Sequence, residues 1–183
     1  DFEPLVVAYT GTIYGHFDAK AIVAFIQNIL TFNERVVFVF YGNDQLKLEQ
    51  KLGEERRVIF FGNQPMKKTH CLQKKADILF FIHEPYKSTA SSIPASAVIS
   101  TKAFEYLKSR KPVLAIGNID SSESEALQLL GANNELLYFN YELASVEWEL
   151  VNDFLRKIRA APRPLPLDLS REAIMSDYVK LFR

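Results

Sequence analysis

Residues 5–41 read LVVAYTGTIYGHFDAKAIVAFIQNILTFNERVVFVFY and contain two short runs in which nearly every residue is apolar, Leu5–Tyr9 and Val36–Tyr41. Such runs are typical of parallel strands that helices cover on both faces, because neither side of the strand meets water. Between the two runs, apolar residues recur at helical spacing at positions 22, 25, 26 and 29. The pattern therefore predicts a strand, a helix and a second strand that is parallel to the first.

The same alternation continues along the chain, with helix-period segments between further apolar runs. Four more runs of this kind are Val58–Phe61, Ile78–Ile82, Pro112–Ile116 and Leu136–Phe139. Strands that alternate with helices favour right-handed crossovers and a parallel sheet. The sequence thus predicts an α/β fold: a doubly wound, mainly parallel, six-stranded Rossmann-like sheet with helices on both faces.

Several helix ends carry recognisable signals. Asp18 and Asp44 are predicted N-caps, and Gly53 is predicted to end the helix that follows Asp44. Ser122 and Glu125 have the spacing of a capping box, which predicts a helix that Gly131 ends.

The chain is predicted to hold one domain followed by a short appendage. Residues 1–160 form the predicted Rossmann-like domain, 161–169 a proline-rich linker, and 170–183 a final amphipathic helix. The chain starts at Asp1, without an initiator Met or the flank of a secretory signal, so we expect it to be part of a longer polypeptide.

Composition narrows the classes of function. Lys plus Arg and Asp plus Glu number 22 each, so charge gives no argument for binding nucleic acid. The single cysteine, Cys71, excludes an intramolecular disulfide and sites built from several thiolates. No apolar run has the length of a transmembrane helix, which is about 20 residues. We expect a cytoplasmic protein, with attachment to the inner face of the membrane as an alternative for the full-length protein.

Glycine and short polar residues follow nearly every predicted strand, where ligands bind in open α/β sheets. The first of these turns, Gly11 to Asp18, leads into a helix N-terminus, whose free amides and positive dipole end suit a phosphate. It is neither G-x-G-x-x-G nor a Walker sequence, which disfavours nicotinamide dinucleotides and direct nucleotide hydrolysis. Strand-to-helix turns also need such residues for purely structural reasons.

Ser100 to Ala115, STKAFEYLKSRKPVLA, resembles the P-S-K-x-F-E-Y-L-A-x-G-K-P-V-L-A block of retaining, two-domain (GT-B) glycosyltransferases of the group 1, family 4-like class. The start Tyr9 to Tyr14, YTGTIY, is similar to the Y-x-G-T-x-Y start of the donor domain in that family. Ala76 to Leu79, ADIL, looks like its A-D-I/V-x strand entry. The resemblance spans about residues 5 to 160 and implies the C-terminal, donor-binding half of such an enzyme.

The resemblance also implies donor-binding residues. These are Gly11, Thr12 and Gly15 near the diphosphate, Gly62 and Asn63 near the base, and Thr101, Lys102 and Glu105 in the matched block. His16 is a further donor-binding candidate because it lies in the same turn as Gly11, Thr12 and Gly15. A carboxylate such as Glu105, early in a helix, can accept both hydroxyls of a ribose. Lys102 lies three residues earlier on the same helical face, within reach of a phosphate. The structural alternative is an exposed Lys–Glu pair on a helix surface.

The implied function is transfer of a hexose-type sugar, with retention, from a UDP- or GDP-sugar to a glycan or lipid-linked acceptor in polysaccharide biosynthesis. The acceptor groups are expected in an N-terminal domain that this chain lacks, and no metal or other cofactor is expected. No catalytic residue is assigned. His16, His70 and His83 show no spacing of metal ligands. His83, at the end of a predicted strand, is predicted at the surface, with a position that faces the donor sugar as the alternative.

Two departures from the family pattern keep other functions open. Thr12 stands where many relatives have Arg, and Ala97 where many have a Glu near the sugar. A non-catalytic nucleotide-binding or interaction module with a degraded donor pocket is therefore the alternative. A flavodoxin-like or receiver-like domain is a third hypothesis, although none of the first strands ends in the acidic cluster of a receiver.

Overall fold

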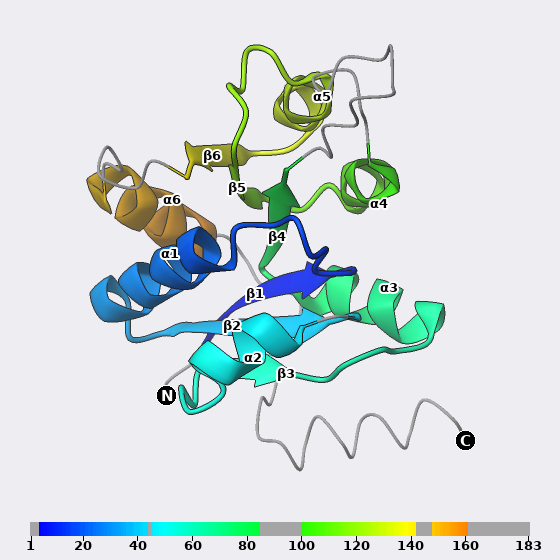
Figure 1. Cartoon of the computed structure of the whole chain (residues 1–183). Helices are drawn as coiled ribbons and strands as arrows, with labels where there is room; N and C mark the ends of the chain where they lie inside the picture. The colour runs from blue at the N-terminus through cyan, green and yellow to red at the C-terminus, as the bar shows by residue number, and fades with distance from the viewer. Residues whose placement is uncertain (1–3, 44, 85–99, 142–147, 161–183) are drawn as a thin grey trace.

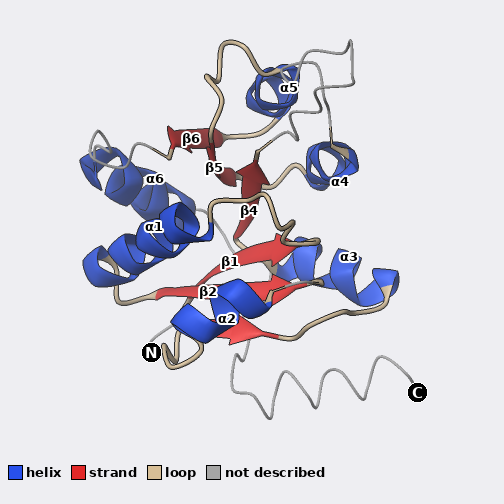
Figure 2. Ribbon diagram, in the orientation of Figure 1, coloured by secondary structure: helices blue, strands red, loops and turns tan. Residues whose placement is uncertain are grey.

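The computed structural model describes residues 4–43, 45–84, 100–141 and 148–160. Its centre is one sheet of six parallel strands in the order β3-β2-β1-β4-β5-β6. The strands are β1 (Leu5–Thr10), β2 (Val36–Tyr41), β3 (Val58–Phe60), β4 (Ile78–His83), β5 (Val113–Gly117) and β6 (Leu136–Asn140). Figures 1 and 2 show this sheet between helices, which confirms the predicted doubly wound α/β fold.

Six helices of the described residues cover the two faces of the sheet. The core on one face contains residues of α1 (Ala19–Phe32), α2 (Leu46–Leu52) and α6 (Trp148–Ala160). The core on the other face contains residues of α3 (Met66–Lys75), α4 (Thr101–Ser109) and α5 (Glu125–Asn133). None of the helices in the described part of the chain has the length and apolar character needed to cross a membrane.

The strand order creates the place for a ligand. From β1 the chain winds outward through β2 and β3, and it then returns to β4 on the other side of β1. The turns after β1 and β4 therefore diverge at the carboxyl edge of the sheet. In open α/β sheets this divergence leaves a crevice in which ligands bind.

The core on the α1 side contains a cluster of aromatic rings among its many aliphatic side chains. The Phe80 ring in β4 lies 5.6 to 6.4 Å, between ring centroids, from four others: Tyr9, Phe25, Phe38 and Phe40. These five residues are at most 5% exposed. Burial of such large rings stabilises the fold, together with burial of the aliphatic side chains around them.

The predicted helix ends are partly confirmed. The Asp18 carboxylate caps α1 by accepting hydrogen bonds from two backbone N–H groups, and α2 ends at Gly53. The predicted Ser122 cap is wrong: Ser124, which is buried, caps α5, whereas Ser122 is exposed. The prediction that Gly131 ends this helix is also wrong, because α5 continues to Asn133. Asp44, the linker 161–169 and the helix 170–183 lie outside the described residues.

Gly42, directly after β2, packs against the turn that follows β1. Its φ is +152°, and a Cβ added to it would lie 1.6 Å from the carbonyl oxygen of Gly11. We expect Gly42→Ala to lower the free energy of unfolding by about 2 kcal/mol, because the backbone is strained and the two turns must separate. Urea denaturation measures this. Gly15→Ala is the matched control, since nothing lies within 4 Å of a Cβ there, and an equal loss in both variants would contradict the prediction.

Candidate functional site

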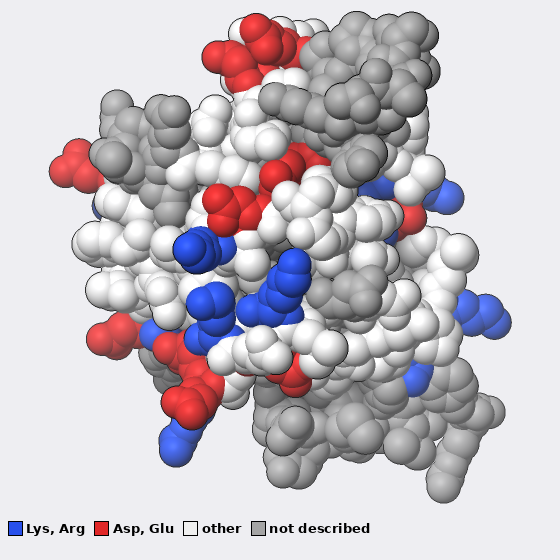
Figure 3. All heavy atoms as spheres, in the orientation of Figure 1, with Lys and Arg blue, Asp and Glu red and all other residues white. Residues whose placement is uncertain are grey.

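A cleft of about 330 Å³ opens at the carboxyl edge of the sheet. It lies where the turns after β1 and β2, the loop from β3 to α3, and the start of α4 meet. Its lining residues are Gly11, Thr12, Tyr41, Gly42, Asn43, Asn63, Gln64, Met66, Thr69, His70, Lys102 and Glu105. Most of these residues are of polar types, and Lys102 and Glu105 bring opposite charges to the cleft. Figure 3 shows basic and acidic side chains interspersed on the face in view, in keeping with the net charge of zero.

The structure brings together five of the nine residues predicted from the sequence. Gly11, Thr12, Asn63, Lys102 and Glu105 all line this cleft, although 94 positions separate the first from the last. The other four predicted residues, Gly15, His16, Gly62 and Thr101, are not among the lining residues.

The β1 turn and helix α4 approach each other closely at one end of the cleft. A Cβ on Gly11, whose φ is +156°, would lie 3.3 Å from Cε of Lys102. The Tyr9 hydroxyl donates a hydrogen bond of 2.8 Å to the carbonyl oxygen of Thr12 and so fixes the turn from below. Glycine at position 11 therefore leaves room for the end of the Lys102 side chain beside the turn.

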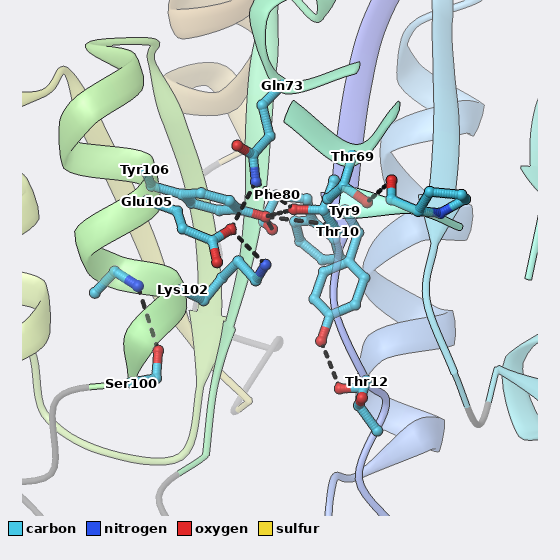
Figure 4. Close-up of polar contacts among 12 residues, drawn as sticks. Tyr9, Thr10, Thr12, Thr69, Gln73, Phe80, Ser100, Lys102, Glu105 and Tyr106 are labelled. Carbon is cyan, nitrogen blue, oxygen red and sulfur yellow. Dashed lines mark hydrogen bonds and ion pairs between the residues drawn. The ribbon is translucent and has the colours of Figure 1, made fainter. Parts of the chain in front are cut away.

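Glu105 has the most defined surroundings of the cleft residues (Figure 4). Lys102 Nζ lies 2.7 Å from its Oε2, and Gln73 Nε2 donates to the same oxygen at 2.9 Å. Among the described residues, none donates a hydrogen bond to Oε1. The Glu105 side chain is 33% exposed. One carboxylate oxygen is thus held by two side chains, and the other accepts no hydrogen bond from the part of the chain that the structure describes.

The electrostatic surroundings keep this carboxylate ionised. Burial alone would raise the pKa of Glu105. Hydrogen bonds from Lys102 and Gln73, and the positive charges of Lys102 and His70, outweigh burial and lower that pKa below its ordinary value. Glu105 can therefore serve as a hydrogen-bond acceptor for hydroxyl groups at neutral pH.

Beneath Glu105 lies a buried polar layer that the sequence analysis did not identify. Gln73 in α3, Thr10 at the end of β1 and Tyr106 in α4 are each at most 4% exposed. Gln73 Nε2 donates to Thr10 Oγ1 at 2.8 Å, and the Tyr106 hydroxyl donates to the carbonyl oxygen of Phe80 at 3.0 Å. The signal available in the sequence was the position of Gln73 directly after Leu72, on the side of α3 that is buried.

The start of α1 differs from the prediction that its amides are free for a phosphate. Asp18 accepts from Lys20 N at 2.9 Å and from Ala21 N at 3.1 Å, and Glu84 Oε2 accepts from Asp18 N at 2.8 Å. Two carboxylates therefore satisfy these amides and would repel an anion. The prediction of bare amides facing a phosphate is wrong at this helix N-terminus.

Glu84 also accounts for the placement of His16. His16 Nε2 lies 2.9 Å from the Glu84 carbonyl oxygen, and the Tyr141 hydroxyl donates to Glu84 Oε2 at 2.7 Å. These contacts connect the first turn to the ends of β4 and β6, away from the cleft. No motif in the sequence indicates this role for Glu84.

His83 was predicted at the surface, but it is only 3% exposed. Its Nε2 lies 2.7 Å from Ser124 Oγ, and Ser124 Oγ also accepts from Leu127 N at the start of α5. A serine hydroxyl that donates to Nε2 requires a neutral ring. Burial disfavours the charged form and lowers the pKa of His83 to about 4.

This burial makes the stability of the protein depend on pH. The unfolded chain takes up a proton on His83 below its ordinary pKa of 6.5, whereas the folded protein does so only near 4. The contribution of His83 is therefore fully present above pH 6.5 and is lost as the pH falls toward 4. We expect protonation of His83 in the unfolded chain to lower the free energy of unfolding by about 2 kcal/mol when the pH falls from 7 to 5.

Urea denaturation of wild type and His83→Gln at several pH values checks this. The variant should lose less stability than wild type between pH 7 and pH 5, because glutamine does not titrate. Identical pH dependence in the two proteins would contradict the assignment.

No group of three or more His, Cys, Asp or Glu side chains within residues 4–43, 45–84, 100–141 and 148–160 is placed to hold a metal ion. The single cysteine, Cys71, is a half-buried free thiol on α3.

No protein-family model matches the sequence, and no curated protein sequence matches it. The fold is similar to that of Anabaena HepE, solved with UDP-glucose, at 18% identity and a TM-score of 0.52 over 86% of this chain and 39% of that one. It is similar to the C-terminal domain of a glycosyl transferase group 1 family protein, LpcC, from Francisella tularensis, at 16% identity and a TM-score of 0.52 over 96% of this chain and 88% of that domain.

An epimerase shows the same likeness. UDP-GlcNAc 2-epimerase from Neisseria meningitidis, solved with UDP-GlcNAc, matches at 14% identity and a TM-score of 0.54 over 98% of this chain and 45% of that one. The chain thus spans less than half of the full-length proteins HepE and the epimerase, but most of the single LpcC domain. This chain has the Rossmann-like fold found in one domain of GT-B glycosyltransferases and of this nucleotide-sugar epimerase.

Proposed function

We propose that this chain is the domain of a two-domain glycosyltransferase that binds the nucleotide-sugar donor. The observation that carries the proposal is Glu105: an ionised, one-third exposed carboxylate in a cleft at the carboxyl edge of the sheet, with a glycine turn beside it. The fold is that of domains in proteins solved with UDP-glucose and UDP-GlcNAc, which supports a nucleotide sugar as ligand.

In this proposal the nucleotide lies along the cleft with its ribose at Glu105. The ribose hydroxyls donate to the carboxylate, whose Oε1 has no donor among the described residues. The base lies toward Asn63 and Gln64, and the diphosphate toward Gly11 and Thr12. Gly15, His16, Gly62 and Thr101 are not part of this proposal, because they do not line the cleft.

Lys102 has a double role in this arrangement. Its Nζ lies 2.7 Å from Glu105 Oε2. The pair is not an exposed Lys–Glu pair on a helix surface, because it lines the cleft and the lysine side chain is only 21% exposed. Its ammonium has three protons, so it can keep the carboxylate contact and still donate to a phosphate. A positive charge there would stabilise the nucleoside diphosphate as it leaves the sugar.

The remaining features of the reaction follow from the resemblance in the sequence. The donor is a UDP- or GDP-sugar of the hexose type, and transfer proceeds with retention to a glycan or lipid-linked acceptor. The acceptor groups come from a further domain of the same polypeptide, no metal ion takes part, and the enzyme works in the cytoplasm. The isolated chain accordingly binds the nucleotide without turning over.

A thermal-shift titration with UDP, GDP and ADP tests the proposal. One of UDP and GDP should raise the melting temperature in proportion to the logarithm of its concentration above its Kd, because a ligand that binds only the folded state stabilises it. If neither UDP nor GDP shifts the melting temperature at millimolar concentration, the proposed function is contradicted.

A second candidate is a non-catalytic module with a degraded donor pocket. The observation in its favour is the pair of carboxylates, Asp18 and Glu84, that occupies the amides at the start of α1. Assay of the full-length polypeptide with the nucleotide sugar separates the two: sugar transfer to an acceptor supports the enzyme, and nucleotide binding without transfer supports the module. Epimerised donor in the same assay would instead indicate the reaction of the epimerase with this fold.

A further inference from the structure

We propose that Gln73 is a positioning residue for the nucleotide: anchored on Thr10, it holds Oε2 of Glu105 so that Oε1 faces the ribose hydroxyls. This inference rests on the proposed function. It identifies Gln73 as the residue that determines the preference of the proposed nucleotide site for ribose.

The amide orientation of Gln73 is determined by its partners. Gln73 Nε2 lies 2.9 Å from Glu105 Oε2 and 2.8 Å from Thr10 Oγ1, and an ionised carboxylate only accepts hydrogen bonds. The NH₂ group must therefore face Glu105, and its two protons serve the two partners. Figure 4 shows the Gln73 amide pointing between Glu105 and Thr10.

The anchor beneath Gln73 is itself buried and hydrogen-bonded. The Tyr106 hydroxyl gives its only proton to the Phe80 carbonyl oxygen, so the contact of 3.5 Å between Thr10 Oγ1 and Tyr106 has Thr10 as its donor. Thr10 Oγ1 is then left as an acceptor for Gln73. The chain of contacts runs from β4 through Tyr106, Thr10 and Gln73 to the cleft, and all members except Glu105 are buried.

Lys102 and Gln73 together position the Glu105 carboxylate better than Lys102 alone would. Its side chain belongs to the same helix as Glu105, at three residues' separation, and lies at the edge of the cleft. A lysine stem is flexible and its ammonium is a point charge, whereas the Gln73 amide is planar, buried and held at a second atom. A carboxylate fixed in this way loses less freedom when hydroxyl groups bind to it.

The experiment compares wild type with Gln73→Met, which has the same length but no donor. Calorimetry measures the Kd of the nucleoside diphosphate that wild type binds, UDP or GDP, and of its 2′,3′-dideoxy analogue. We expect Gln73→Met to weaken binding of the ribonucleotide about tenfold and to leave the affinity for the dideoxy analogue unchanged, because only ribose hydroxyls use Glu105. Equal weakening for both ligands, or no weakening of the ribonucleotide, would overturn the inference.

Two further variants complete the design. Gln73→Asn keeps the amide, but its side chain is one methylene shorter and cannot reach both Thr10 and Glu105. It should therefore give the same result as Gln73→Met, and it takes the place of Gln73→Met if that variant does not fold. Gln50→Met, on the exposed side of α2, is the matched control and should bind both ligands as wild type does.

A measurement without nucleotide separates this inference from the proposed function. The carboxyl ¹³C signal of Glu105, followed by NMR against pH, should show a higher pKa in Gln73→Met than in wild type, because a hydrogen bond that stabilises the charged form is lost. An unchanged pKa would overturn the role of Gln73. If wild type binds neither UDP nor GDP, the proposed function fails, and this titration still decides whether Gln73 positions Glu105.

Discussion

Glu105→Ala is expected to weaken binding of the nucleoside diphosphate at least about 100-fold, which abolishes the thermal shift at millimolar nucleotide. Two ribose hydroxyls lose a charged acceptor at once, and each such hydrogen bond contributes about 1.5 kcal/mol or more. Isothermal titration calorimetry of wild type and variant measures the effect directly.

The matched control is Glu49→Ala, which removes an exposed glutamate on α2 that does not line the cleft. The control should keep the affinity of wild type. The proposal is contradicted if Glu105→Ala retains wild-type affinity while its far-ultraviolet circular dichroism shows a folded protein.

Phe80→Ala is expected to give the largest loss of stability, about 4 kcal/mol, which corresponds to a fall in melting temperature of about 10 °C. The ring is fully buried at the centre of β4 and contacts the rings of Tyr9, Phe25 and Phe38. Its removal leaves a cavity on the face covered by α1, α2 and α6, which the rigid sheet cannot close. Calorimetric or urea unfolding measures the change.

Phe104→Ala is the matched control for this prediction. Phe104 lies on α4 and is 54% exposed, so the change should alter the free energy of unfolding by less than about 1 kcal/mol. Similar losses in the two variants would mean that the buried ring of Phe80 contributes no more to stability than an exposed one.

The fold was predictable because it depends on patterns that are local in the sequence. Apolar runs such as Val36–Tyr41 become buried strands wherever helices cover both faces, and the predicted strand bounds differ from those of the structure by at most one residue at either end. The cap of α5 was not predictable in this way. Ser122 and Ser124 are both suitable N-caps, and the choice of Ser124 depends on its contact with His83, 41 residues earlier.

The site was predictable only where its residues lie in recognisable turns or in the block from Ser100 to Ala115. Glu105 and Lys102 belong to that block and line the cleft. Gln73 reaches Glu105 across 32 positions of sequence, and Glu84 reaches the Asp18 amide across 66. Such contacts depend on tertiary packing, so neither the layer beneath Glu105 nor the filled amides at α1 had a signal strong enough to be identified.

The most direct test is a crystal structure of the chain with the nucleoside diphosphate that stabilises it, UDP or GDP. We predict that the nucleotide occupies the cleft beside Gly11, with its ribose hydroxyls within hydrogen-bonding distance of Glu105 and with Gln73 still on Oε2. A nucleotide bound elsewhere on the chain, or a ribose that makes no contact with Glu105, would contradict the proposed function.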